Sequence, residues 1–239
     1  MTPLLLLFTT VATGVAVAVA VALCLVLLEG DGLPSLSKDD QGNRNPMLPW
    51  WFALTFVHVV ILFGWALLLG YWDILRLDTE PDAWWVGTLY FFGYWAHFEV
   101  FYWICHRTQH CLPTFGWLTG HRGEMSAKFH HGMRPPYGPD MITAFAAHPC
   151  DAFIVQLSAQ SPWLTTTLVC RAVGVQPLTM GAPTYGVIIA WLAYIGIRAH
   201  SRKGFGGAYH CKHHDDPSTG PYSFSGFPER MLMLRYGSQ

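Results

Sequence analysis

The sequence predicts an all-α fold, an integral membrane bundle of four to five transmembrane helices. Hydrophobic residues make up 52% of the 239 residues and charged residues only 12%, whereas a soluble domain carries about 25% charged residues. Uncharged runs alternate with short polar loops, and most of these runs reach the roughly 20 residues that a helix needs to cross a bilayer. The net charge is −1, so the chain lacks the positive field that attracts nucleic acid, and no nucleic-acid partner is expected.

Two uncharged runs come first, residues 2–28 and 47–72. The first has no Lys or Arg before it and is longer than the apolar core of a secretory signal, so we expect a retained helix, with a cleaved signal as the alternative. The second opens with Trp50 and Trp51, aromatic residues typical of the membrane–water interface. It contains His58, which we expect to be hydrogen-bonded to a neighbour rather than to bind a metal. Residues 1–83 are therefore predicted to form an N-terminal transmembrane region.

The later runs are less uniform. Residues 84–103 are crowded with aromatic side chains and contain Glu99, an ionisable group of the kind that faces a cavity within a membrane protein. Residues 141–170 are apolar but contain charged or polar interruptions, and residues 172–197 are uncharged. Because Pro177 and Pro183 disfavour a helix interior, the last membrane helix is expected to begin only near Thr184.

Histidine dominates the polar segments. The stretch 207–217 reads GAYHCKHHDDP, and residues three and four apart on a helix share a face, so its three imidazoles converge. His106 and His110 form a second such pair. Neutral imidazole suits iron, zinc, copper or nickel, so the pattern predicts a histidine-rich cap that binds metal, whereas a chance surface cluster is the alternative. Further histidines follow in the other polar segments: His121, His130, His131, His148 and His200.

The distribution of positive charge predicts the side on which this cap lies. If the histidines form one site, the segment 141–197 must cross the membrane an even number of times. Only Arg76 and Arg171 of the 14 Lys and Arg residues then fall on the opposite side. Cytosolic loops carry the excess of Lys and Arg, so the histidine cap is expected to face the cytosol. A cleaved first helix would invert this orientation.

The order of the histidine motifs resembles a known family. FYW-x-x-HR-x-x-H, HH, HP-x-D, AHS and YH-x-x-HH follow one another between residues 84 and 238. This series resembles the fatty acid hydroxylase/sterol desaturase superfamily of integral membrane di-iron oxygenases. The resemblance implies that residues 84–239 form the di-iron domain, with metal ligands at His106, His110, His121, His130, His131, His200, His210, His213 and His214.

One motif departs from the family pattern. The second box of the family is His-(Lys/Arg)-x-His-His, but Ala127 stands three residues before His130 here. His121 with Arg122 resembles the first half of the box, and residues 129–131 resemble the second, with residues 123–128 inserted between them. We expect His121 to be a ligand; the alternative is that one ligand is lost and the site is weakened or inactive. Groups expected to support the ligands by hydrogen bonds are His148, Asp151 and Asp215, and also Asp140 and Asp216.

The resemblance further implies an activity. Two iron ions would use O2 to hydroxylate or desaturate a lipid, such as a sterol or a fatty acyl chain, in lipid biosynthesis. Electrons would come from NAD(P)H through a donor such as cytochrome b5 and its reductase, at the membrane of the endoplasmic reticulum. An acyl-lipid desaturase of the related three-box class is one alternative. A catalytically inactive relative that acts as a membrane metal-binding or scaffold protein is another, and a transporter fits less well because the histidines lie at helix ends.

Overall fold

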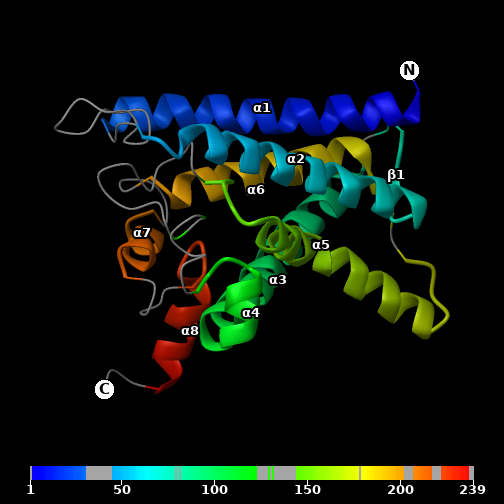
Figure 1. The fold of residues 1–239 in the computed structure, drawn as a ribbon. Coiled ribbons are helices and arrows are strands. Elements are labelled where there is room, and N and C mark those ends of the chain that lie inside the picture. The colour runs from blue at the N-terminus through cyan, green and yellow to red at the C-terminus, as the bar shows by residue number, and fades with distance from the viewer. Residues whose placement is uncertain are drawn as a thin grey trace.

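The computed structural model describes residues 2–30, 45–78, 80, 82–122, 129, 131, 144–177, 179–201, 207–216 and 222–236, and these are mostly helical (Figure 1). The helices are α1 (Pro3–Glu29), α2 (Leu48–Tyr71), α3 (Trp84–Cys111), α4 (Pro113–Leu118), α5 (Pro149–Ala172), α6 (Ala182–Ala199), α7 (Gly207–Asp215) and α8 (Phe227–Tyr236). Two short strands, β1 (Leu75–Arg76) and β2 (Met180–Gly181), pair in parallel.

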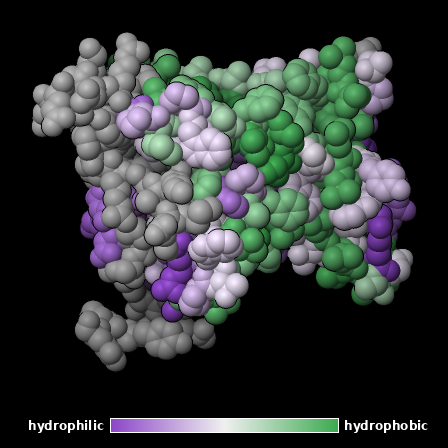
Figure 2. Space-filling model, in the orientation of Figure 1, coloured by the Kyte–Doolittle hydropathy of each residue, from purple (hydrophilic) through white to green (hydrophobic). Residues whose placement is uncertain are grey.

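Three of the described helices, α1, α2 and α6, are long and apolar enough to cross a membrane. This finding agrees with the predicted class of integral membrane protein. Helices α3 and α5 are 28 and 24 residues long, and they expose large apolar side chains such as Leu89 on α3 and Leu168 on α5. Their sequences are more polar than those of the other three, so a total of four to five spans stays a prediction. Figure 2 shows apolar side chains gathered over much of the described face.

Local chemistry fixes the ends of these helices. The Thr2 hydroxyl accepts a hydrogen bond from the Leu5 amide at the start of α1, and Gly30 ends that helix in the left-handed conformation, with φ at 63°. Helix α5 begins at Pro149, later than the apolar run 141–170 suggested, because His148 is its N-cap and accepts from the Cys150 amide. Helix α6 begins at Ala182, two residues before the predicted start.

Helix α1 packs along α6, with which it shares more contacts than any other helix pair does. The two helices approach most closely at Gly14 and Gly186, where a Cβ atom on Gly14 would lie 2.7 Å from the Gly186 carbonyl oxygen. Near the other end of α6, the buried Arg198 guanidinium lies 2.7 Å from both Glu29 carboxylate oxygens. The N-terminal region is therefore joined to the rest of the bundle along much of α1.

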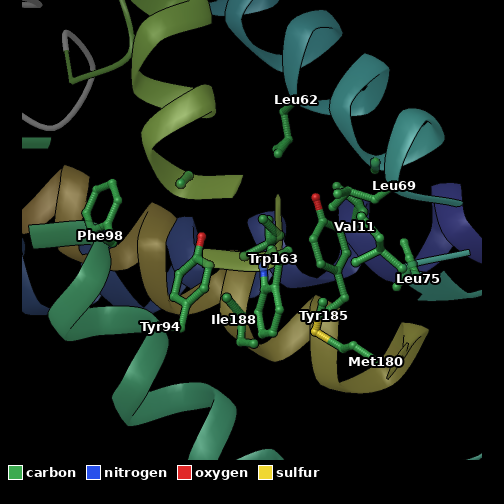
Figure 3. Packing of buried hydrophobic residues seen from close by; sticks show 14 of the residues in the cluster. Val11, Leu62, Leu69, Leu75, Tyr94, Phe98, Trp163, Met180, Tyr185 and Ile188 are labelled. Carbon is green, nitrogen blue, oxygen red and sulfur yellow. The ribbon is translucent and has the colours of Figure 1, made fainter. Parts of the chain in front are cut away.

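The main core lies between the long helices, as Figure 3 shows. Its buried side chains come from α1, α2, α3, α5, α6 and the strand pair, and they include Val11, Leu69, Leu75, Tyr94, Trp163, Met180, Tyr185 and Ile188. At one end of this core, Leu75 is paired with Met180 across the strands. Asp82 closes that end, because it accepts hydrogen bonds from Arg76 at 3.0 Å and from the Gly181 amide at 2.9 Å. Helices α7 and α8 lie at the opposite end (Figure 1).

Candidate metal centre

Two groups of buried histidines lie at the α7 end of the bundle. The first consists of His106, His110, His121 and His131, and the second of His200, His210 and His214. In each group one nitrogen from every ring lies within 4.8 Å of the corresponding nitrogens of the others, an arrangement that could hold a metal ion. The predicted ligands therefore come together from α3, α6, α7 and the segment between α4 and α5.

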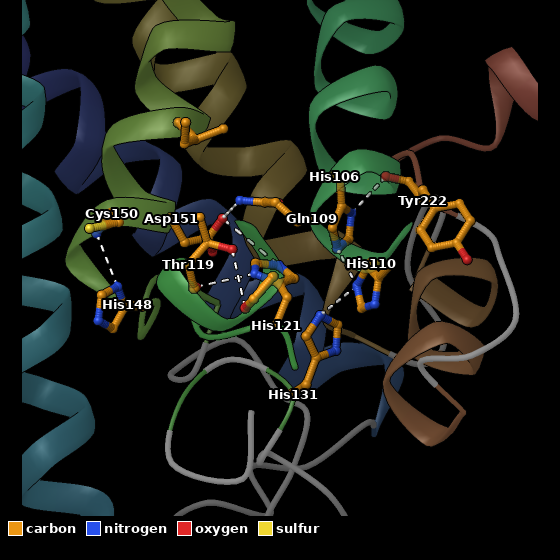
Figure 4. A network of polar contacts seen from close by, with 12 residues as sticks. His106, Gln109, His110, Thr119, His121, His131, His148, Cys150, Asp151 and Tyr222 are labelled. Carbon is orange, nitrogen blue, oxygen red and sulfur yellow. Dashed lines mark hydrogen bonds and ion pairs between the residues drawn. The ribbon is translucent and has the colours of Figure 1, made fainter. Parts of the chain in front are cut away.

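His110 lies between His106 and His131 in the first group (Figure 4). Its Nε2 atom lies 3.3 Å from His106 Nε2, 3.2 Å from His131 Nε2 and 3.1 Å from His213 Nε2. Nitrogen ligands about 2.1 Å from one ion are about 3.0–3.4 Å apart in octahedral or tetrahedral geometry. His213 thus belongs with the first group by distance, and the spacing of the four nitrogens suits ligands that share an ion.

Backbone carbonyl groups orient three of the rings. His106 Nδ1 lies 2.8 Å from the Tyr222 carbonyl oxygen, His121 Nδ1 lies 3.2 Å from that of Thr119, and His200 Nδ1 lies 2.7 Å from that of Gly196. Because a carbonyl oxygen only accepts, each Nδ1 must carry the proton. The Nε2 atom of each neutral ring then keeps its lone pair for a metal, the arrangement in which protein groups hold a ligating histidine.

The second group adjoins the first. His200 follows the last residue of α6, and its ring centroid lies 4.9 Å from those of both His210 and His214 on α7. Between the groups, the rings of His131 and His214 are 5.1 Å apart and those of His106 and His210 are 6.1 Å apart. The two groups can therefore form one centre for two neighbouring ions.

Burial keeps four of these imidazoles neutral, those of His106, His110, His200 and His210. It lowers the pKa of His110 to about 2, with a further contribution from neighbouring His121 and His213. It also lowers the pKa of His200 to about 4. The pKa values of His106 and His210 fall well below the ordinary range, first because of burial and then because of neighbouring histidines. Neutral rings are the form that binds metal ions.

Of the predicted supporting groups, Asp151 contacts the first histidine group. Its Oδ1 atom is 3.8 Å from His121 Nε2 and accepts a hydrogen bond of 2.9 Å from Gln109 Nε2. His148 belongs to neither histidine group; it caps α5 and packs edge-on against Phe129. Asp215 and Asp216 are exposed at the end of α7.

Parts of the irregular second box lie outside the described residues, namely His130 and the insertion 123–128, as does Asp140. His121 itself lies within the first group, with its ring centroid 5.1 Å from those of both His106 and His110. Its position is the one expected of a ligand despite the insertion before His131.

The sequence interpretation missed several groups that hold the centre together. The segment before α8 supplies the Tyr222 carbonyl, and Glu229 fixes that segment by accepting hydrogen bonds from the amides of Tyr222 at 2.7 Å and Ser223 at 3.0 Å. No local pattern indicates a contact between positions 106 and 222. Gln109 could have been found, because it lies three residues after His106 on α3 and therefore on a neighbouring part of the helix surface.

A cavity of about 150 Å³ lies beside the centre. His200, Asp151, Tyr102 and Phe224 line it at the histidine end, and mostly apolar side chains from α1, α2, α3, α5, α6 and the segment 144–147 line the remainder. The Tyr102 ring is 5.2 Å from His106 and the Phe224 ring is 5.4 Å from His210. Aromatic side chains therefore lie between the cavity and His106 and His210, whereas His200 of the second group faces the cavity directly.

Comparison with known proteins found no matching family model, no similar curated protein and no similar solved structure. The family resemblance of the histidine motifs therefore remains a prediction.

Proposed function

We propose that this chain is a membrane-bound di-iron oxidoreductase that uses O2 to hydroxylate, or to desaturate, a lipid. The observation that carries the proposal is the position of two adjoining buried histidine groups beside an apolar cavity between membrane-type helices. A metal centre for a water-soluble substrate would need no such cavity. A metal store would not need the oriented, neutral imidazoles described above.

The donor set fits iron. Imidazole binds iron, zinc, copper and nickel, but only a metal that changes oxidation state can pass electrons to O2, which excludes zinc. With bound iron, the centre would supply the oxidising power for the balanced reaction R–H + O2 + 2 electrons + 2 protons giving R–OH + water. Desaturation would instead remove two hydrogen atoms and release two water molecules. NAD(P)H, through a donor such as cytochrome b5 and its reductase, is the proposed source of the electrons.

The residues of this chain would then bind the substrate, orient the metal ligands and exclude water from the site. The carbonyl groups of Tyr222, Thr119 and Gly196 hold imidazole rings in the orientation and tautomer that a metal needs. Tyr102 and Phe224 line the cavity beside His106 and His210, and His200 lines it directly. An apolar substrate in the cavity would thus lie next to the centre in a site without bulk water.

The proposed location is the endoplasmic reticulum, with the histidine end in the cytosol. The excess of Lys and Arg in the segments that flank the histidines supports the cytosolic orientation, and the choice of the endoplasmic reticulum follows from the family resemblance.

Metal analysis of the detergent-purified protein tests the proposal. We expect two irons per chain in the wild type, and we expect the His121→Ala variant to lose or halve that content. The matched control is His148→Asn, since His148 lies in neither group and asparagine is also a good helix N-cap. The control should keep both irons.

Three outcomes would change the conclusion. Wild-type protein without stoichiometric metal would favour the catalytically inactive relative. Two irons retained in His121→Ala would exclude His121 as a required ligand and leave the oxidoreductase proposal intact. An iron-loaded, reduced protein that consumes no O2 in the presence of any lipid would contradict the enzymatic proposal directly.

A further inference from the structure

The cavity extends well beyond the histidine end. Along α6 its lining residues run from Ile189 to His200, which corresponds to about 16 Å at a rise of 1.5 Å per residue. The remaining walls come from α1, α2, α3, α5, the segment 144–147 and Phe224, and none of the described residues that line the cavity is a Lys or Arg. Such a space suits an elongated apolar molecule, and it offers no positive group to a carboxylate or a phosphate.

A pair of polar side chains interrupts this apolar lining. His58 on α2 and Gln156 on α5 both line the cavity, although only 4% and 8% of their surfaces are exposed. Their Nε2 atoms are 2.9 Å apart. An amide nitrogen only donates, so the Gln156 amide donates to His58 Nε2, and the proton of the neutral imidazole is on Nδ1.

This geometry leaves one strong acceptor. The Gln156 Oε1 atom is buried and has no hydrogen-bond partner among the described residues. A buried polar group without a partner is costly, and most such groups in proteins are satisfied. At a cavity wall, the missing partner can be supplied by a ligand that donates a hydrogen bond.

The hydrogen-bonding groups at this cavity wall determine which kind of ligand can bind there. His58 Nδ1, which carries the proton, is likewise buried without a hydrogen-bond partner among the described residues. A carbonyl, ether or carboxylate oxygen only accepts and would meet the Gln156 oxygen as a second acceptor, whereas a hydroxyl group can donate to Gln156 Oε1 and also accept from a donor such as His58 Nδ1. We propose that the His58–Gln156 pair binds the hydroxyl group of a neutral lipid alcohol within this cavity. Gln156 lies five residues beyond Asp151 on α5, about 7.5 Å deeper along the helix than the histidine end. The catalytic meaning of the pair rests on the proposed function: the hydroxyl would be held away from the centre, and another carbon of the same molecule would face it.

Binding of matched probes to the full-length protein in lipid nanodiscs tests this inference without any turnover. The probes are radiolabelled decan-1-ol, methyl decyl ether and decane, with empty nanodiscs giving the background from partition into lipid. We expect decan-1-ol to bind about tenfold more tightly than the ether or the alkane, the value of one buried hydrogen bond. The double variant His58→Leu/Gln156→Leu should lose that preference, because both polar partners are replaced by apolar groups of similar size.

The control is Gln160→Leu. Gln160 is a buried amide on the same helix, one turn further on, and it does not line the cavity, so this variant should keep the preference for the alcohol. Equal binding of the three probes to the wild type would overturn the inference, as would an alcohol preference that survives in the double variant. If the protein binds the alcohol but binds no iron, this result would support the alcohol site and contradict the proposed function.

Discussion

The two ends of the helix bundle are built differently. At the histidine end, side chains from α3, α6 and α7 converge on buried sites, and their orientation depends on carbonyl groups from other segments. At the strand end, a two-residue strand pair and the partly exposed Arg76–Asp82 contact join α2, α3 and α6. The first end fixes the positions of a few nitrogen atoms, and the second fixes how helices are connected. Metal affinity and fold stability should therefore respond to different substitutions.

The largest effect is expected for His110→Ala. His110 lies within 3.3 Å of three other imidazole nitrogens, so its loss should empty the first site, while the site of His200, His210 and His214 keeps its ion. Metal content should fall from two ions to one per chain. Two ions retained in this variant would show that the first group does not hold metal.

Arg198→Met should reduce stability more than metal affinity. The Arg198 guanidinium is buried and contacts Glu29 across the α1–α6 interface, and Glu29 is partly exposed and can be hydrated after the change. We expect a loss of about 2 kcal/mol in the free energy of unfolding, below the 3–5 kcal/mol of a fully buried pair. Thermal or denaturant unfolding in detergent measures it, with Glu29→Gln as the partner variant. An unchanged unfolding free energy would show that the ion pair does not hold the interface.

Glu229→Gln, in contrast, should reduce metal affinity more than stability. Gln would keep one acceptor oxygen but lose the charge that holds the amides of Tyr222 and Ser223, and with them the carbonyl that orients His106. Groups that orient metal ligands affect metal affinity by about 10–100-fold, so we expect about a tenfold weaker affinity at nearly unchanged stability. Competition with a chelator measures this affinity. A Glu229→Gln variant with wild-type metal affinity would show that Glu229 does not help to hold the metal centre.

The smallest effect is expected at the strand end. Asp82→Asn removes a charge from the Arg76 contact and weakens the bond to the Gly181 amide. A partly exposed pair of this kind contributes about 1 kcal/mol or less, so unfolding should be about 1 kcal/mol easier and iron content should stay at the wild-type value. A loss of iron here would mean that the two ends are coupled.

Sequence reasoning succeeded where the signal was local. Uncharged runs of membrane length located α1 and α2 to within a few residues, and the two prolines in the last run located the start of α6, because backbone groups in lipid must satisfy one another within a helix. The pairing of His106 with His110 followed from helical spacing. His121 lies in the first group, and the split interpretation of the second box stays a prediction.

The parts of the fold and the site that the sequence did not predict depend on contacts between positions that are distant in the chain. Position 106 meets position 222, and His58 meets Gln156 across 98 residues, so no local pattern predicts either contact. The strands are too short to show an alternating pattern. His148 precedes a proline at a helix start, and its use as an N-cap follows from that position more readily than from its resemblance to a metal motif.

Because α1 packs closely against α6, the first helix also forms part of the cavity wall. Val15 and Val19 of α1 form part of the cavity wall, in the same stretch that Gly14 holds against Gly186. A protease that cleaved the chain after this helix would therefore remove one wall of the cavity as well as a membrane anchor. For the same reason, a bulky residue in place of Gly14 would push the wall outward, so α1 also limits the width of the molecules that the cavity can admit.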